Sequence, residues 1–189
     1  MQVPTASGYG FGASVLWASV VFLLPGAFAG FVAASLSGRY IDRFGARPVL
    51  VAGAALGSVG FAMLALAHSV SWQIIAASIL INAYISLAYG ALPALVVGEV
   101  EAGETAVATS MNAIARTVGA STAAAVVAVL LSRNGAGYPP ESSFTILFAL
   151  GAATGAAAML LIAASRPRLR RVESVEEISE SRAMSHEWG

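Results

Sequence analysis

Cysteine and lysine are absent from this sequence, and charged residues of every kind are scarce. Without cysteine the chain can form no disulfide and has no thiol nucleophile. Charged residues make up 11% of the 189 residues, whereas a soluble domain carries roughly 25%. So few charges cannot cover the surface of a globular protein, and lipid must therefore surround much of the chain. The formal net charge of zero also argues against a nucleic-acid partner.

Long apolar runs dominate what remains, and hydrophobic residues account for 58% of the chain. Each run reaches the length of about 20 residues that one bilayer crossing requires. In lipid an open sheet would leave backbone polar groups unpaired, and a β-barrel would show alternating strands of about 10 residues. We therefore predict an all-α, polytopic membrane helix bundle. Its five transmembrane helices are expected over residues 11–37, 48–67, 73–98, 105–131 and 144–165.

Arginine is distributed unevenly over the segments between these runs. The first connection and the segment after the last run hold Arg39, Arg43, Arg47, Arg166, Arg168, Arg170 and Arg171, whereas the opposite side holds Arg133. Because basic residues are enriched on the cytoplasmic side, we expect the first connection and the charged tail, residues 166–189, in the cytoplasm. Residues 1–10 are then expected outside, in a multi-pass protein of the plasma membrane. The acidic, polar composition of the tail predicts disorder.

The first connection concentrates charge and glycine between two apolar runs. We expect a short hairpin loop from Gly38 to Arg47, in which Gly38 lets one helix end approach a neighbour and Gly45 allows a tight reversal. Asp42 is expected to accept backbone N–H groups at the N-terminus of a neighbouring helix, where the helix dipole favours a carboxylate. The helix over 105–131 begins on the same side and is the candidate partner.

The arginines of this loop have two candidate roles. Arg43 and Arg47 are expected to anchor the loop in the cytoplasm and to pair with Asp42 or with the Glu99–Glu104 loop. The simpler alternative is that these charges only set the topology.

Polar residues interrupt the third run, over 73–98, at helical spacing. Asn82 and Tyr89 lie on a face that should look inward, because polar side chains within a span are costly towards lipid. Two interpretations stay open: these side chains line a cavity, or they form contacts between helices.

The fourth run, over 105–131, contains the charged residue Arg116. An arginine near the bilayer centre costs about 2.5–3.5 kcal/mol on insertion scales. We therefore expect Arg116 to face other helices or to snorkel towards the cytoplasmic end. Asn112 and Gly119 share its helical face, which is a second candidate for a cavity or a helix contact.

Pairs of glycines four residues apart occur in three of the runs. These pairs are Gly26/Gly30, Gly53/Gly57 and Gly151/Gly155. Such spacing lets two helix backbones approach closely, so the pairs are candidate helix contacts. In a chain with 19 glycines, chance spacing is the alternative.

Nothing in the sequence has the spacing of a metal site, a nucleotide-binding loop or a catalytic dyad. The two histidines, His68 and His186, are isolated from each other. We therefore expect no enzyme activity, no metal and no cofactor.

Two of these segments resemble a known family. The residues Gly38, Asp42, Arg43, Gly45, Arg47 and Leu50 match the signature loop of the major facilitator superfamily, Gly-x-Leu-x-Asp-Arg-x-Gly-Arg-Arg-x-x-Leu. Tyr40 replaces the usual leucine, and Ala46 replaces one basic residue. The segment with Asn112, Arg116 and Gly119 is similar to the Asn-x-x-x-Arg-x-x-Gly segment in the penultimate helix of the multidrug-exporter branch, the drug:proton antiporters.

The resemblance implies a secondary active transporter that exports hydrophobic small molecules, with the lipid bilayer and an unidentified substrate as its partners. The family folds as two six-helix halves that rock about a midplane site. If the loop is the copy between helices 8 and 9, this chain is most of the C-terminal half, and its missing partner is the N-terminal half. No carboxylate is clearly embedded in the spans, so a coupling proton site is expected in the missing part. The alternatives are a stand-alone five-helix membrane protein, a partner subunit, or a non-functional truncated transporter.

Overall fold

The computed structural model describes residues 12–67, 69–100, 103–132 and 139–165, and helices are the only regular secondary structure there. The elements are α1 (Val15–Ala18), a π-helical segment η2 (Ser19–Leu23), α2 (Leu24–Phe44), α3 (Ala46–Leu66), α4 (Ser71–Glu99), α5 (Thr105–Ser132) and α6 (Glu141–Ala164). Because α1, η2 and α2 follow one another without a break, five helices of the described chain are long and apolar enough to cross a membrane. This confirms the predicted all-α membrane bundle. The predicted terminal segments 1–10 and 166–189 lie outside the described residues.

The connection between the first two spans is much shorter than predicted. α2 continues through Gly38 to Phe44 and α3 begins at Ala46, so Gly45 alone separates the two helices. The predicted loop from Gly38 to Arg47 is therefore wrong, because most of it forms the last turns of α2. A helix that leaves the hydrocarbon keeps its backbone hydrogen bonds, and its charged side chains reach water. The end of the apolar run consequently did not mark the end of the helix.

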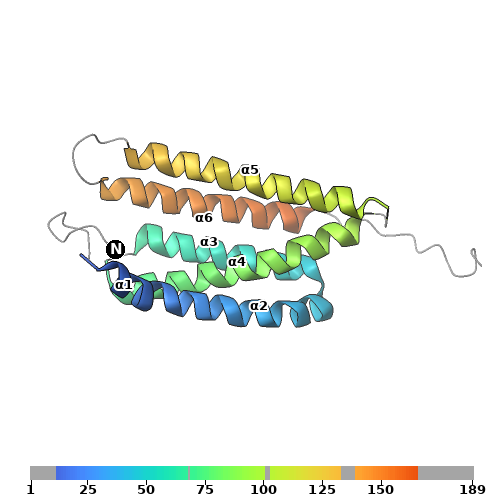
Figure 1. Cartoon of the computed structure of the whole chain (residues 1–189), viewed down its shortest axis with the longest axis horizontal. Coiled ribbons are helices and arrows are strands. Elements are labelled where there is room, and N and C mark those ends of the chain that lie inside the picture. The colour runs from blue at the N-terminus through green and yellow to red at the C-terminus, as the bar shows by residue number, and fades with distance from the viewer. Residues whose placement is uncertain (1–11, 68, 101–102, 133–138, 166–189) are drawn as a thin grey trace, which may run out of the picture.

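The five spans run up and down along the long axis of the bundle (Figure 1). The turn at Gly45, the start of α5 and the end of α6 lie at one end, which we call the turn end, and α1 begins at the other. The first connection and the end of the last helix thus lie on the same side of the bundle, as the arginine pattern requires.

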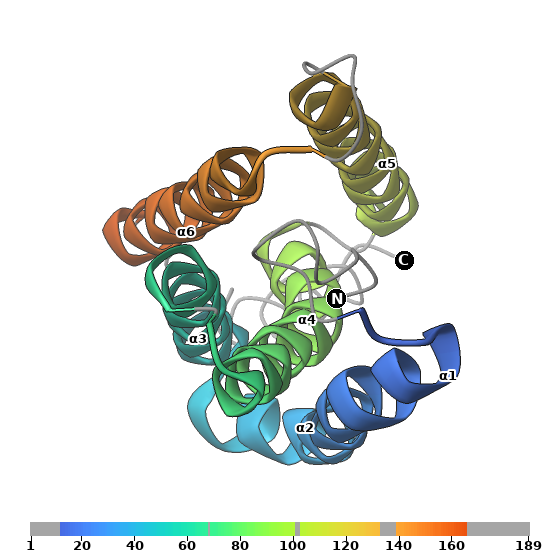
Figure 2. The same cartoon turned by 90° about the vertical axis from the view of Figure 1, so that its left-hand side faces the viewer.

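α4 lies at the centre of the packed part of the bundle. It packs against α2 and α3, and α6 packs against the outer side of α3 (Figure 2). Each of the three predicted glycine pairs faces one of these neighbours: Gly26/Gly30 and Gly53/Gly57 face α4, and Gly151/Gly155 face α3. This confirms that the pairs are helix contacts, where close backbone approach supplies van der Waals packing.

Two of these close contacts lie along α3. A Cβ built on Gly57 would lie 2.6 Å from Cδ1 of Tyr84 on α4. A Cβ built on the α6 residue Gly155 would lie 2.6 Å from Oγ of Ser58 on α3. Both distances are too short for a real methyl group, so helix separation here depends on the absence of a side chain.

A cluster of buried side chains lies near the turn end. Val49 and Leu50 of α3 form a cluster with Ala88 and Ala91 of α4, and Ile162 of α6 packs against it. The turn at Gly45 is therefore attached to a packed cluster that joins α3, α4 and α6.

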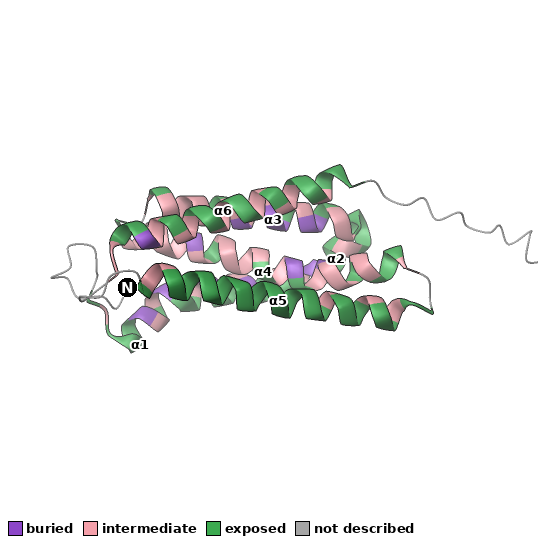
Figure 3. Ribbon diagram, turned by 90° about the horizontal axis from the view of Figure 1, so that it is seen from above, coloured by how far each residue is buried: buried purple, intermediate pink, exposed green. Residues whose placement is uncertain are grey.

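α5 differs from the other spans. None of its residues is buried, and Figure 3 shows it exposed along almost its whole length. Among the described elements it contacts α4 and α6 alone. α5 is therefore held at the margin of the bundle, and the described helices leave most of its residues exposed.

Candidate functional site

A single glycine closes the turn between α2 and α3. Gly45 has a φ of +85°, in a region that other residues rarely adopt, and its N–H donates to the carbonyl of Ile41 at 2.7 Å. This confirms the predicted reversal at Gly45. By contrast, a Cβ built on Gly38 would meet no described atom within 4 Å, so the described helices make no close approach there.

Arg47 links this turn to the end of α6. Its Nε and one terminal nitrogen, Nη2, donate to the carbonyl of Ile162 at 3.0 and 2.8 Å, and Nη2 also donates to Oγ of Ser165 at 3.0 Å. The last carbonyls of a helix have no partner within the helix and carry the negative end of its dipole. The guanidinium therefore caps α6, which differs from the predicted pairing with Asp42 or the Glu99–Glu104 loop.

The other charged residues of the turn lie at the surface. The guanidinium of Arg43 lies 5.4 Å from the centre of the Phe44 ring, at cation–π distance. Asp42 is exposed. α2 makes no contact with α5 in the described part of the chain. The predicted docking of the Asp42 carboxylate on the N-terminus of α5 is therefore not present in this structure.

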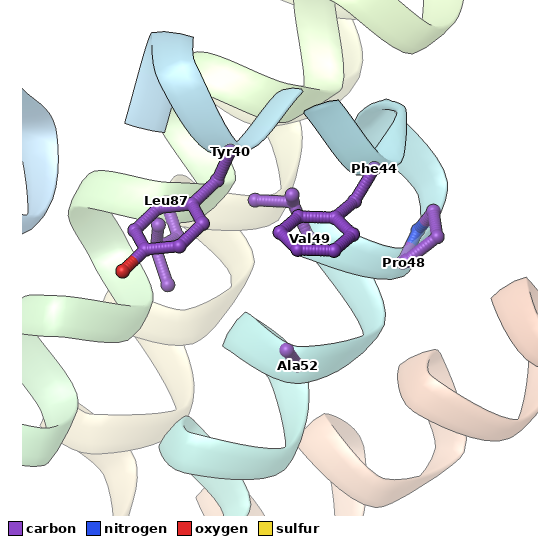
Figure 4. Close-up of a pocket in the computed structure, with 6 residues that line it drawn as sticks. All are labelled: Tyr40, Phe44, Pro48, Val49, Ala52 and Leu87. Carbon is purple, nitrogen blue, oxygen red and sulfur yellow. The ribbon is translucent and has the colours of Figure 1, made fainter. Parts of the chain in front are cut away.

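Beside the turn lies an apolar hollow between α2 and α3, and Leu87 of α4 completes its lining (Figure 4). The rings of Tyr40 and Phe44 stack over it with centroids 6.3 Å apart. Its volume is about 330 Å³, and it continues into a hollow of about 450 Å³ that shares Tyr40 and Leu87. Its lining presents almost no polar atoms, so it fits an acyl chain or an apolar side chain and cannot orient a polar ligand.

Asn82 lies at the contact between α4 and α2. Its Nδ2 donates to the carbonyl of Ser78 at 2.9 Å, and its side chain lies against Gly26 and Gly30 of α2. Of the two interpretations left open for Asn82, the structure favours a helix contact.

Tyr89 and Arg116, by contrast, meet each other between α4 and α5. The guanidinium carbon of Arg116 lies 4.0 Å from the centre of the Tyr89 ring, a cation–π contact. Both side chains line a pocket of about 190 Å³. The complete lining is Tyr84, Ile85, Ala88, Tyr89, Leu92 and Arg116. Two residues predicted on separate helices thus form one site.

The other two α5 candidates do not line this pocket. Asn112 is half-buried. A Cβ built on Gly119 would meet nothing within 4 Å among the described residues. The structure therefore gives neither residue a part in the pocket between α4 and α5.

Arg116 also stands out by its depth. It lies between two and three residues from the midpoint of α5 (Thr105–Ser132), or about 4 Å at 1.5 Å per residue. Among the described residues it is the one charged side chain near the middle of a span. The described acidic residues are all at helix ends: Asp42, Glu99, Glu104 and Glu141.

Sequence reasoning missed two parts of this arrangement. The partner of Arg47 lies 115 residues away at Ile162, and no local pattern points to it. Tyr84 was detectable, because Tyr84, Ala88 and Leu92 recur every four residues and so share one face of α4. That face carries the apolar lining of the pocket.

Comparison with known proteins agrees with this architecture. The family model of the Major Facilitator Superfamily matches residues 2–188. Comparisons with curated proteins and with solved structures found no match. The family match covers nearly the whole chain, including all five spans, the turn at Gly45 and the pocket between α4 and α5. The chain therefore belongs to the major facilitator superfamily, a family of membrane transporters.

Proposed function

We propose that this chain forms most of the C-terminal half of a secondary active exporter of hydrophobic small molecules. Its turn end faces the cytoplasm, and its membrane is the plasma membrane. Membership of the superfamily supports transport in general. The multidrug-type segment from Asn112 to Gly119 and the arginines at the turn end support the narrower function and the orientation.

The exposed polar surface of α5 is the observation that carries the proposal. Arg116, Thr117 and Ser121 are exposed on a helix with no buried residue. Ionisable side chains within a span almost always face a bundle interior or a water-filled cavity, because hydrocarbon solvates them poorly. α5 therefore fits a helix that lines a transport pathway, with the other half of the transporter on its far side.

The pocket beside α5 supports a substrate with an apolar body. Ile85, Ala88 and Leu92 provide its aliphatic wall, and Tyr84 and Tyr89 provide aromatic surface. Ligand sites in proteins are typically of this kind, mostly apolar with a few polar groups that orient the ligand. In this pocket the orienting groups are the phenol hydroxyls and the guanidinium of Arg116.

Coupling to protons requires a group that this pocket does not contain. The described acidic residues lie at helix ends, whereas proton relays in transporters use carboxylates or histidines inside the membrane. We therefore assign the coupling carboxylate to the other half of the transporter.

Reconstituted transport tests the proposal. One set of liposomes holds this chain alone, and a second holds it together with the rest of the same transporter, which is the six-helix N-terminal half and the remaining helix of the C-terminal half. With an imposed pH gradient and a fluorescent hydrophobic dye, we expect gradient-driven dye movement from the two halves together. Movement driven by this chain alone would support the stand-alone alternative. No movement with both halves present would contradict the exporter function.

Asp42 provides a test of the turn end in the complete transporter. Asp42 is exposed and α2 does not reach the N-terminus of α5 among the described helices, so a docking role needs a helix N-terminus of the other half. With that docking we expect Asp42→Asn to lower the transport rate by up to about fivefold, because such a carboxylate contributes up to about 1 kcal/mol. The amount of inserted protein should not change. Arg39→Gln, three residues earlier on α2, is the matched control and should transport normally. Normal transport by Asp42→Asn would contradict the proposed docking of the Asp42 carboxylate on a helix N-terminus.

A further inference from the structure

We infer that the pocket between α4 and α5 is a binding site for a small organic anion that carries one aromatic ring. The anionic group lies on the guanidinium of Arg116, and the ring lies against Tyr84 and Tyr89. This inference rests on the proposed transport function for its biological role, because it names the class of substrate. The site itself depends only on the residues of the pocket.

The first argument is the uncompensated charge of Arg116. The arginine guanidinium keeps its charge in proteins and carries five N–H donors. The ring of Tyr89 is its one interaction partner among the described residues, so none of these donors bonds to another described residue. The described carboxylates lie at helix ends, far from the middle of α5. A mid-membrane cation with free donors calls for an anion that reaches it from outside the described helices.

The second argument is the planar geometry of the guanidinium. Arginine binds carboxylate-like groups through two parallel N–H···O bonds in its own plane. Its central carbon lies 4.0 Å from the centre of the Tyr89 ring, and none of its N–H donors bonds to a described residue, so the donors at its edge are left for a ligand. Tyr89 thereby orients the guanidinium while 59% of its own surface stays exposed. The ring is thus available to a second planar group.

The third argument is the size and lining of the pocket. Its volume of about 190 Å³ is below the roughly 300–1,000 Å³ typical of sites for drug-sized ligands. It therefore fits a ligand with a single ring. The apolar wall of Ile85, Ala88 and Leu92 favours a hydrocarbon or aromatic body, and the positive charge of Arg116 disfavours cations.

The depth of the site identifies the source of the anion. Arg116 lies about 4 Å from the midpoint of α5, whereas lipid phosphates lie outside the hydrocarbon core, which is about 30 Å thick. With the midpoint of α5 at the bilayer centre, Arg116 therefore lies too deep for a lipid headgroup. A soluble monocarboxylate that enters between the helices does.

Three single-ring ligands of different charge test this site. Benzoate, benzamide and benzylamine share one ring and are negative, neutral and positive at pH 7. Their binding to the full chain is measured by equilibrium dialysis in nanodiscs of zwitterionic lipid, so that no anionic lipid competes. We expect benzoate to bind at least about tenfold more tightly than benzamide, since a hydrogen bond to a charged group has this effect. Benzylamine should bind most weakly.

Variants connect this preference to the pocket. Arg116→Gln should lower benzoate affinity about tenfold or more and leave benzamide affinity nearly unchanged. Arg116→Lys should retain part of the preference, because it keeps the charge and loses the planar fork. Tyr89→Leu should weaken benzoate binding by removing the ring that orients the guanidinium. Arg39→Gln, an exposed arginine at the turn end, is the matched control and should bind like the native chain.

Two results would overturn the inference: equal binding of benzoate and benzamide by the native chain, or native benzoate affinity in Arg116→Gln. Circular dichroism and gel filtration check that each variant folds. If Arg116→Gln does not fold, the order of the three ligands on the native chain and the Tyr89→Leu result decide the outcome. The test is independent of transport. Anion binding without transport would support the binding site and contradict the exporter function. Transport without a preference for anions would support the exporter function and contradict the binding site.

Discussion

α3 and α5 are both apolar helices rich in small residues, yet they stand in opposite environments. α3 lies between α4 and α6 and buries Gly53, Gly57 and Gly60 against α4. α5 touches α4 and α6 at the margin and buries no residue. The glycine of α5, Gly119, has open space where the glycines of α3 have a neighbour.

This contrast shows how position in the bundle gives similar residues different roles. In lipid there is no hydrophobic force between helices, so close packing at small residues holds them together. Along α3 such packing is present on two sides, which makes this helix the scaffold. α5 lacks it and carries the one mid-span charge among the described residues, so it is the helix that a ligand or another part of a transporter can reach.

The largest effect is expected from filling the contact between α3 and α4. Gly57→Ala would bring a methyl group within 2.6 Å of the Tyr84 ring, and such overpacking typically costs about 1–3 kcal/mol. Gly119→Ala on α5 is the matched control. It should be neutral or stabilising by up to about 1 kcal/mol, because alanine favours the helix. Reversible unfolding in mixed micelles measures both variants. Equal free energies of unfolding would contradict the distinction between the two helices.

A smaller effect is expected from the cap on α6. Arg47→Gln removes the donors to Ile162 and Ser165 and should cost about 1.5 kcal/mol, the lower end for hydrogen bonds that involve a charged group. Because the loss is local, hydrogen exchange should rise in the last turn of α6 and stay unchanged in α5. Arg39→Gln, on α2 before the turn, should leave the exchange of α6 unaltered. Unchanged exchange at the end of α6 in Arg47→Gln would show that the cap contributes no stability.

The smallest effect is the expected difference in the free energy of unfolding between Asn82→Ala and Asn112→Ala. Asn82 packs against Gly26 and Gly30 of α2, while its hydrogen bond stays within α4. Asn82→Ala should therefore destabilise the contact between α4 and α2 by less than about 0.6 kcal/mol, the average measured for hydrogen-bonding side chains between membrane helices. Asn112→Ala, on α5, should leave the free energy of unfolding unchanged. Unfolding in mixed micelles again measures the difference. A larger cost for Asn112→Ala would indicate that α5 is held in the bundle by polar contacts.

The sequence predicted the spans and several details of the packing. Apolar run length located five helices because a bilayer requires that length. The reversal at Gly45 and the three glycine pairs followed from conformational freedom and from close backbone approach, which are both local properties. The extent of α2 was wrong because hydropathy marks where a helix leaves the lipid, and hydrogen bonding decides where it ends.

The sequence predicted the individual residues of the candidate site, but it did not predict that they contact each other. Tyr89 and Arg116 each stood out as polar residues within a span, but they lie on different helices, 27 positions apart. Asn82 lies on the same helix as Tyr89 and meets α2, whereas Tyr89 meets α5. Sequence periodicity gives the face of a helix, and it does not give the neighbour that the face meets.

By itself, the sequence determined that the described chain has five helices long and apolar enough to cross a membrane, that it reverses at Gly45, and that one arginine lies near the middle of such a helix. These properties follow from hydrophobicity, backbone sterics and charge, which act over a few residues at a time. Only the tertiary structure decided that Arg47 caps α6, that α5 stays at the margin, and that Arg116 lies over Tyr89 in a pocket. Those outcomes depend on how helices distant in sequence pack together, and that packing is decided by side-chain shape across whole interfaces.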